Sequence, residues 1–221
     1  MVSIIIPTFE DTSKLYDELF LCMKSIRQHT NPGIPYEIIV VDCGNEPRGY
    51  VQPSNQGMAA GRYPIKIVFN KDSVVGPGWL EPLIEACLKG YWLFSSWHPG
   101  DGLGAALGFS PEAYAYFKGF DPAYRYWYAP TDLERKCQML GKPMLNCRAS
   151  DVRHIDHGEQ GTNSTFDLIG KTVSHPLLAG WVAADEATYT LRYGPLRPEQ
   201  RIPHEDAPPK WFQPPNLQSE C

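Results

Sequence analysis

Polar side chains that can bind a charged ligand follow three apolar stretches of this 221-residue chain. The first stretch is β-branched and predicts a strand buried on both faces of a parallel sheet, the second predicts another buried strand, and the third predicts a further strand. The stretches, with the residues that follow them, are 2–6 with Pro7, Thr8, Phe9, Glu10 and Asp11, 36–41 with Asp42, and 65–69 with Asn70, Lys71 and Asp72. Because ligands bind at the carboxyl ends of parallel strands, we expect these residues to form one site.

The residues after the first stretch limit the chemistry of that site. Dinucleotide-binding domains place a glycine-rich loop here, so that helix amides hold a phosphate. Pro7, Thr8 and Phe9 occupy this position instead. If a nucleotide binds, the charge of its diphosphate needs another partner, and a divalent metal held by carboxylate oxygens is the obvious one. Asp72 is the nearest candidate ligand for such a metal.

The segments between the apolar stretches predict the elements that position this site. Apolar residues recur at three- and four-residue spacing from 15 to 26, which predicts a helix that stops at 31–33. Strand, helix and strand within about forty residues form a βαβ unit with a right-handed crossover. The stretch from 44 to 61, rich in glycine, proline and asparagine, is interpreted as an irregular connection.

The rest of the chain predicts shorter elements. We expect helices from Pro77 to Gly90, from Ser110 to Phe117 or Lys118, and from Thr131 to Gly141. Short strands are predicted at 91–94, 144–147 and 152–155, with a glycine-rich turn or bulged strand at 100–108. The stretch 177–193 is compatible with a helix, and an extended tail follows from 195. We therefore expect one domain at 1–160 and an extension at 161–221 that packs on or beside it.

Composition restricts the class of protein. The chain is 43% hydrophobic and 20% charged, as in ordinary globular proteins, and its net charge of −5 argues against a nucleic-acid partner. Its six cysteines form no CxxC pair, which is typical of reduced cytosolic thiols. No apolar run predicts a signal peptide or a membrane span, so we expect a cytoplasmic protein, and nothing indicates membrane association.

Several segments, in the right order between residues 2 and 157, resemble glycosyltransferase family 2. The segment 2–9 is similar to the family's first strand and base-binding loop, and 36–44 to its second strand with an acid that contacts uracil or ribose. Asn55 to Arg62 resembles the Asn-x-Gly-x-x-x-Ala-Arg segment near the diphosphate, and 70–72, followed by 77–80, stands where the family has its metal-binding DxD. Later matches lie at 104–110, 119–121 and 132–135. Together they are far more specific than any one motif.

The resemblance implies a GT-A fold, which is a Rossmann-like α/β domain with a mainly parallel central sheet flanked by helices. It implies inverting transfer of a sugar from a nucleoside-diphosphate donor, UDP-type first, to a hydroxyl of a glycan or glycoconjugate acceptor. Divalent manganese or magnesium would be the cofactor, bound by Asp72 and His157. The residues implied in donor binding are Pro7, Thr8, Phe9, Glu10, Asp42, Asn55, Arg62, Asn70 and Lys71.

Two positions depart from the family pattern. Asn70 replaces the first carboxylate of DxD, and Ala129-Pro130 stands where the family has the Glu-Asp pair that supplies the base. Inverting transfer needs a base for the acceptor hydroxyl. Asp132 is the first candidate and Asp101 the second. The alternative for Asp132 is a helix-terminal role, because Thr131 and Glu134 form a capping box around it.

Aromatic residues and a second histidine complete the candidate set. Trp97, Tyr126 and Trp127 are candidates for the acceptor site, because apolar sugar faces stack on rings. His154 lies in an apolar-leaning run, and we interpret it as structural. Two other classes of protein remain as alternatives: an inert nucleotide-sugar or glycan-binding module that lost its base, and a phosphoacceptor receiver-type domain with Asp42 at its strand end.

Overall fold

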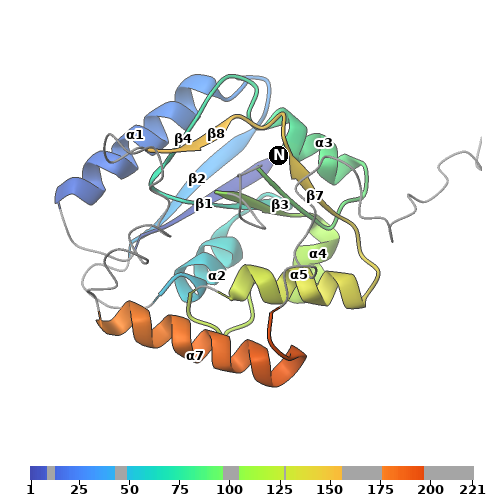
Figure 1. Ribbon diagram of the computed structural model, residues 1–221. Coiled ribbons are helices and arrows are strands. Elements are labelled where there is room, and N and C mark those ends of the chain that lie inside the picture. Colours follow the sequence, from blue (N-terminus) through green and yellow to red (C-terminus); the bar gives the residue numbers. More distant parts are fainter. Residues whose placement is uncertain (9–12, 43–48, 97–104, 127, 156–175, 197–221) are drawn as a thin grey trace, which may run out of the picture.

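The computed structural model describes residues 1–8, 13–42, 49–96, 105–126, 128–155 and 176–196 (Figure 1). The strands are β1 (Val2–Thr8), β2 (Tyr36–Asp42), β3 (Ile65–Phe69), β4 (Ser73–Val75), β5 (Leu93–Ser96), β6 (Ala106–Phe109), β7 (Met144–Cys147) and β8 (Val152–His154). The helices are α1 (Ser13–His29), α2 (Val51–Ala60), α3 (Glu81–Leu88), α4 (Pro111–Phe117), α5 (Ala129–Met139) and α7 (Pro176–Tyr193).

Six strands form the central sheet, in the order β2-β1-β3-β6-β5-β7. Strand β6 runs antiparallel to both of its neighbours, and the other pairs are parallel. The prediction of a mainly parallel sheet is therefore confirmed. The antiparallel strand also argues against the receiver-type alternative, because doubly wound folds of that kind have parallel strands in a different order. Strands β4 and β8 form a separate antiparallel pair.

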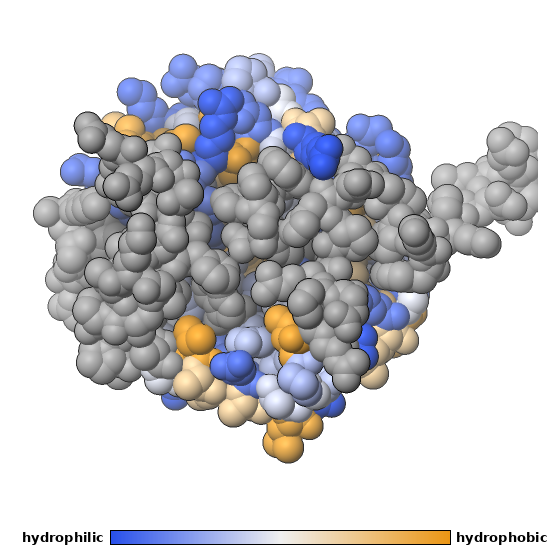
Figure 2. Space-filling model, in the orientation of Figure 1, coloured by the Kyte–Doolittle hydropathy of each residue, from blue (hydrophilic) through white to orange (hydrophobic). Residues whose placement is uncertain are grey.

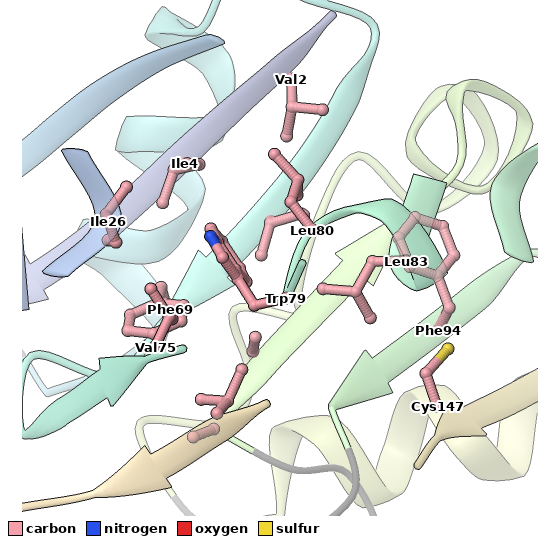
Figure 3. Close-up of a cluster of buried hydrophobic side chains, with 14 of the residues drawn as sticks. Val2, Ile4, Ile26, Phe69, Val75, Trp79, Leu80, Leu83, Phe94 and Cys147 are labelled. Atoms are coloured by element: carbon pink, nitrogen blue, oxygen red, sulfur yellow. The ribbon is translucent and has the colours of Figure 1, made fainter. Parts of the chain in front are cut away.

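Helices cover both faces of the sheet. Figure 1 shows α1 and α3 on one face and α2, α5 and α7 on the other. Strand β1 is buried along its whole length, and its side chains alternate between two cores: Ile4 and Ile6 belong to the first, and Ile5 to the second. Trp79 lies in the middle of the first core (Figure 3), where its Nε1 donates to Thr30 Oγ1 at 3.0 Å.

Helix α2 occupies a stretch that we expected to be irregular. Its composition is poor for a helix, because Pro53 and Gly57 both lie inside it. Pro53 is tolerated in the first turn, where the backbone N–H groups have no partner within the helix. Gly57 packs so closely on β1 that a Cβ there would collide with Ile5. Tertiary packing therefore outweighs the low propensity of this segment.

Other elements differ from expectation mainly in their bounds. Helix α3 begins at Glu81, not at Pro77, because the short strand β4 and a turn precede it. Strand β5 begins at Leu93, and α5 begins at Ala129, two residues before Thr131. The stretch compatible with a helix forms α7, and its Tyr189 is buried in the second core. The division of the chain at residue 160 stays a prediction.

The surface shows where apolar side chains remain accessible. In Figure 2, hydrophilic residues predominate over α1 and hydrophobic residues reach the surface over α7, where Leu191 is 89% exposed. Within the described residues, no helix combines the length and the apolar character needed to cross a bilayer.

Candidate functional site

The ends of β1 and β2 lie side by side, as the sequence predicts. Their register pairs Pro7 with Val41 and Thr8 with Asp42. The Thr8 hydroxyl lies 3.2 Å from Asp42 Oδ1, to which it donates, and 3.4 Å from Val41 O. Thr8 is nearly buried, whereas Asp42 is exposed. The Thr8 hydroxyl therefore orients an accessible carboxylate, which suits Asp42 to accept hydrogen bonds from a ligand such as a ribose. Phe9 and Glu10 lie outside the described residues.

The end of β3 brings a second polar group to the same edge. Strand β3 pairs with β1 in parallel, with Val68 opposite Ile5, so Asn70 follows at the level of Pro7. Asn70 is fixed through its backbone, because its N–H donates to Ala105 O at 2.9 Å and its carbonyl accepts from Ser73 N at 3.2 Å. Lys71 is half-buried beside it. The expected gathering of strand ends is thus present in the described residues.

Asp72 lies against His154, a residue that we expected to be structural. Strand β8 pairs with β4 so that Ser73 faces His154, and Ile155 N donates to Asp72 O at 2.7 Å. His154 Nδ1 lies 3.5 Å from Asp72 Oδ1 and 3.2 Å from Ser73 Oγ. Burial alone would raise the pKa of the Asp72 carboxyl, but its contacts with His154 and Lys71 lower that pKa overall. The carboxylate is therefore held in its charged form.

Asp72 and His154 are candidate ligands of a divalent metal. No group of three or more His, Cys, Asp or Glu side chains converges in the part of the chain that the structure describes. Magnesium and similar ions, however, take only one or two protein ligands when substrate phosphates and waters supply the rest. Adjacent ligands of an octahedral ion lie about 3 Å apart, close to the Asp72–His154 separation of 3.5 Å. His157, the predicted second ligand, lies outside the described residues.

Arg62 lies at the opposite edge of the sheet from these residues. Its N–H donates to Glu37 Oε1 at 2.8 Å, and its Nε lies 3.4 Å from Glu37 Oε2. Glu37 pairs with Ser3, near the amino end of β1. The five steps along the strand from Ser3 to Thr8 span about 16 Å, at about 3.3 Å per residue. The predicted contact of Arg62 with a donor diphosphate does not fit this position.

Asn55 has a structural partner in place of the predicted donor contact. Its Nδ2 donates to Phe120 O at 2.8 Å, and its Oδ1 accepts from Phe120 N at the same distance. A side-chain amide with both ends bonded to one residue holds that backbone in place. Asn55 therefore fixes the turn before residue 121 and does not point to a ligand.

Asp132 is fully buried in the first turn of α5. Its Oδ1 accepts from the hydroxyls of Tyr193, at 2.9 Å, and Tyr124, at 3.2 Å. Lys136 Nζ lies 2.6 Å from Oδ2, and Arg192 Nη1 lies 3.5 Å from Oδ1. A general base must reach the proton that it removes. This carboxylate faces α7 instead, so the prediction that Asp132 is the base does not fit the structure.

Of the three acceptor candidates, only Tyr126 lies within the described residues. Tyr126 is nearly buried, and both it and Arg125 donate their backbone N–H groups to Asp185. Trp97, Trp127 and the second candidate base, Asp101, lie outside the described residues. The sequence did not single out Asp185, since an acid inside a weakly amphipathic helix has no distinctive pattern.

The order of the elements and the polar carboxyl edge define the class: this is a GT-A-type glycosyltransferase fold. No family model and no curated protein sequence matches the chain. Among solved structures, it is similar to GalNAc-T7 with UDP, GalNAc and Mn²⁺ (TM-score 0.61, 14% identity, 87% of this chain and 51% of that one). It is also similar to the mannosyltransferase PcManGT from Pyrobaculum calidifontis with GDP-Man and Mn²⁺ (TM-score 0.60, 15% identity, 90% of this chain and 66% of that one). The chain thus spans about half to two thirds of these proteins.

Proposed function

We propose that this chain is a metal-assisted, inverting glycosyltransferase that transfers a sugar from a nucleoside diphosphate, UDP-type first, to a hydroxyl of a glycan or glycoconjugate. The arrangement that carries this proposal is the carboxyl edge, where Asp42 ends β2, Asn70 and Asp72 follow β3, and His154 contacts Asp72. The fold supports it, because both similar structures are named as complexes with a nucleotide or nucleotide sugar and Mn²⁺.

The residues of the edge with charged or hydrogen-bonding side chains have distinct roles in this proposal. Asp42, oriented by Thr8, accepts hydrogen bonds from the base or ribose of the donor. Asp72 and His154 hold the cation, and Lys71 is a candidate for an additional positive charge near the diphosphate. A divalent cation bound there would neutralise the charge that develops on the leaving diphosphate. Because Asp132 is buried, Asp101 is the remaining candidate for the base that activates the acceptor hydroxyl.

Ligand-induced stabilisation tests the donor site. Thermal unfolding would be followed with UDP, GDP, UDP-sugars and GDP-mannose, with and without Mn²⁺, because a ligand of the folded state raises the unfolding temperature. We expect a shift with one nucleotide class that depends on Mn²⁺ and is lost in Asp72→Asn. Glu85→Gln, an exposed carboxylate on α3, is the control. If no nucleotide raises the unfolding temperature, the proposal is refuted.

A second candidate function is a nucleotide-sugar-binding module without catalysis. Two observations favour it: Ala129-Pro130 replaces the acid pair of the family pattern, and the nearby Asp132 is enclosed by its partners. Donor hydrolysis and sugar transfer, measured on a panel of glycan acceptors, separate the two functions. Tight donor binding with no turnover supports the module. Sugar transfer with inversion at the anomeric carbon, detected by NMR of the product, supports the glycosyltransferase function.

A further inference from the structure

One peptide, between Arg125 and Tyr126, is held from two sides by elements far apart in the sequence. The carbonyl of Arg125 accepts from the N–H groups of Tyr50, at 2.8 Å, and Val51, at 3.1 Å. Asp185, on α7, accepts from Arg125 N through Oδ1, at 2.9 Å, and from Tyr126 N through Oδ2, at 2.8 Å. Asp185 is 1% exposed. A buried carboxylate with both oxygens on consecutive amides allows this backbone very few orientations.

This peptide lies at the carboxyl edge of the sheet. The chain leaves β2 at that edge after Asp42 and then enters α2. Helix α2 ends next to Arg62, which binds Glu37 at the opposite, amino edge. The first turn of α2, where Tyr50 and Val51 contact Arg125, is therefore on the side of Asp42 and Asp72. Gly49 supports the close approach, because its φ is +72° and a Cβ there would lie 2.5 Å from Arg125 O.

Helix α7 also holds the two ends of the segment around this peptide. At one end, Arg192 Nη1 lies 2.7 Å from Asp121 Oδ2, which also lies 2.9 Å from Lys136 Nζ. At the other end, the ring of Tyr189 packs on that of Tyr128, with centroids 5.3 Å apart. In Figure 1, α7 lies alongside α5 and α2 on one face of the sheet. Asp121, the peptide between Arg125 and Tyr126, and Tyr128 are therefore held by α7, and the peptide is also held by the start of α2.

We propose that Asp185 is a positioning residue for the acceptor, because it fixes the backbone of Arg125 and Tyr126 at the carboxyl edge. The inference rests on the proposed glycosyltransferase function. This backbone carries the exposed Arg125 and precedes the half-buried Tyr128 at the start of α5, on the same edge as the donor residues. A fixed backbone holds such accessible side chains in a preformed arrangement for an acceptor. The donor residues do not contact this clamp: Asp42 is the last residue of β2, and Asp72 lies in the turn between β3 and β4.

Asp185→Ala, with the adjacent exposed Glu186→Ala as matched control, tests this role. The first measurement is hydrogen exchange of the amides of residues 125 and 126 in the full chain. We expect exchange about tenfold faster or more in Asp185→Ala, since each amide loses its acceptor, and no change in Glu186→Ala. Asp185→Asn keeps one acceptor oxygen and retains protection of one of the two amides. It is the variant to measure if Asp185→Ala does not fold.

The second measurement is steady-state transfer, with donor and acceptor varied separately. We expect Asp185→Ala to raise the acceptor KM about tenfold and to leave the Mn²⁺-dependent nucleotide stabilisation unchanged, because only the acceptor segment is released. Unchanged exchange at 125 and 126, or an unchanged acceptor KM, overturns the inference. A loss of nucleotide binding in Asp185→Ala as large as the loss of acceptor binding also overturns the inference. A wild-type chain that binds no nucleotide refutes the proposed function instead, and hydrogen exchange then still decides whether Asp185 clamps the segment.

Discussion

Replacing Asp132 by alanine is the sharpest test of how the buried charges of this protein act. The carboxylate is fully buried and is shared by two hydroxyls and two cations, from Tyr124, Tyr193, Lys136 and Arg192. Its removal leaves both hydroxyls without this acceptor and reduces the negative charge that faces Lys136 and Arg192. The predicted consequence is a large loss of stability, and no specific loss of catalysis beyond that.

The size of the loss follows from the environment of the side chain. Breaking a buried ion pair by removal of one partner costs about 3–5 kcal/mol, because the other charge stays buried. Here Asp121 continues to pair with Lys136, at 2.9 Å, and with Arg192, at 2.7 Å. The lower end of the range, about 3 kcal/mol, is therefore expected. With an m-value of about 2 kcal/mol/M in urea, the unfolding midpoint falls by about 1.5 M.

Urea unfolding followed by circular dichroism at pH 7 measures this shift. The control is Glu85→Ala, since Glu85 forms an i,i+4 pair with Lys89 as Asp132 does with Lys136, but with both side chains more than 60% exposed. An exposed pair of this kind is worth below about 0.5 kcal/mol. A loss for Asp132→Ala no larger than that of the control contradicts our reasoning. So does a folded Asp132→Asn variant without any transfer activity, because it would return Asp132 to the role of base.

Three further predictions concern the core, the charge network and the metal pair. Gly57→Ala destabilises the protein by about 1–3 kcal/mol in thermal or urea unfolding, because its Cβ collides with Ile5, whereas Gly180→Ala, with open space around it, does not. Burial raises the pKa of Asp121, but hydrogen bonds from Ala123 N, Lys136 and Arg192 outweigh it and lower that pKa to about 2. The ionised Asp121 therefore contributes about 2 kcal/mol to the free energy of unfolding above pH about 4, and this contribution disappears as the pH falls towards 2. The free energies of unfolding of wild type and Asp121→Asn, measured in urea, should converge over that range. His154→Ala abolishes Mn²⁺-dependent stabilisation by nucleotide, and His29→Ala does not; equal shifts in both variants would refute the metal role of His154.

The strand ends could be predicted from the sequence because two local signals coincide there. Each of the first three strands is a mainly apolar run with polar residues at or just after its end, so the run gives the strand and its end gives the edge. The structure bears this out at Thr8, Asp42 and Asn70. Helix α2 was not predictable in the same way. Its Gly57 weakens the helix locally and is explained only by Ile5 on a neighbouring strand.

The residues whose surroundings the sequence did not predict depend on partners far along the chain. His154 meets Asp72 only because β8 pairs with β4, and no local pattern announces that pairing. Arg62 matches a family motif by spacing, but the length of α2 carries it to the amino edge of the sheet. Spacing gives the distance between residues along a helix. It does not say at which edge of the sheet the helix ends.

The position of Asp132 has a consequence for where a base can come from. Helix α5 begins with Ala129-Pro130. Proline favours the start of a helix, because its ring fixes φ near the helical value and an N–H at this position would have no acceptor within the helix. The next acid, Asp132, is one turn further and is turned towards Tyr193 and Arg192 of α7. The start of α5 thus contributes to holding the fold and offers no accessible carboxylate. If this chain transfers sugar, the base must come from another segment, and Asp101 is the acid to replace first.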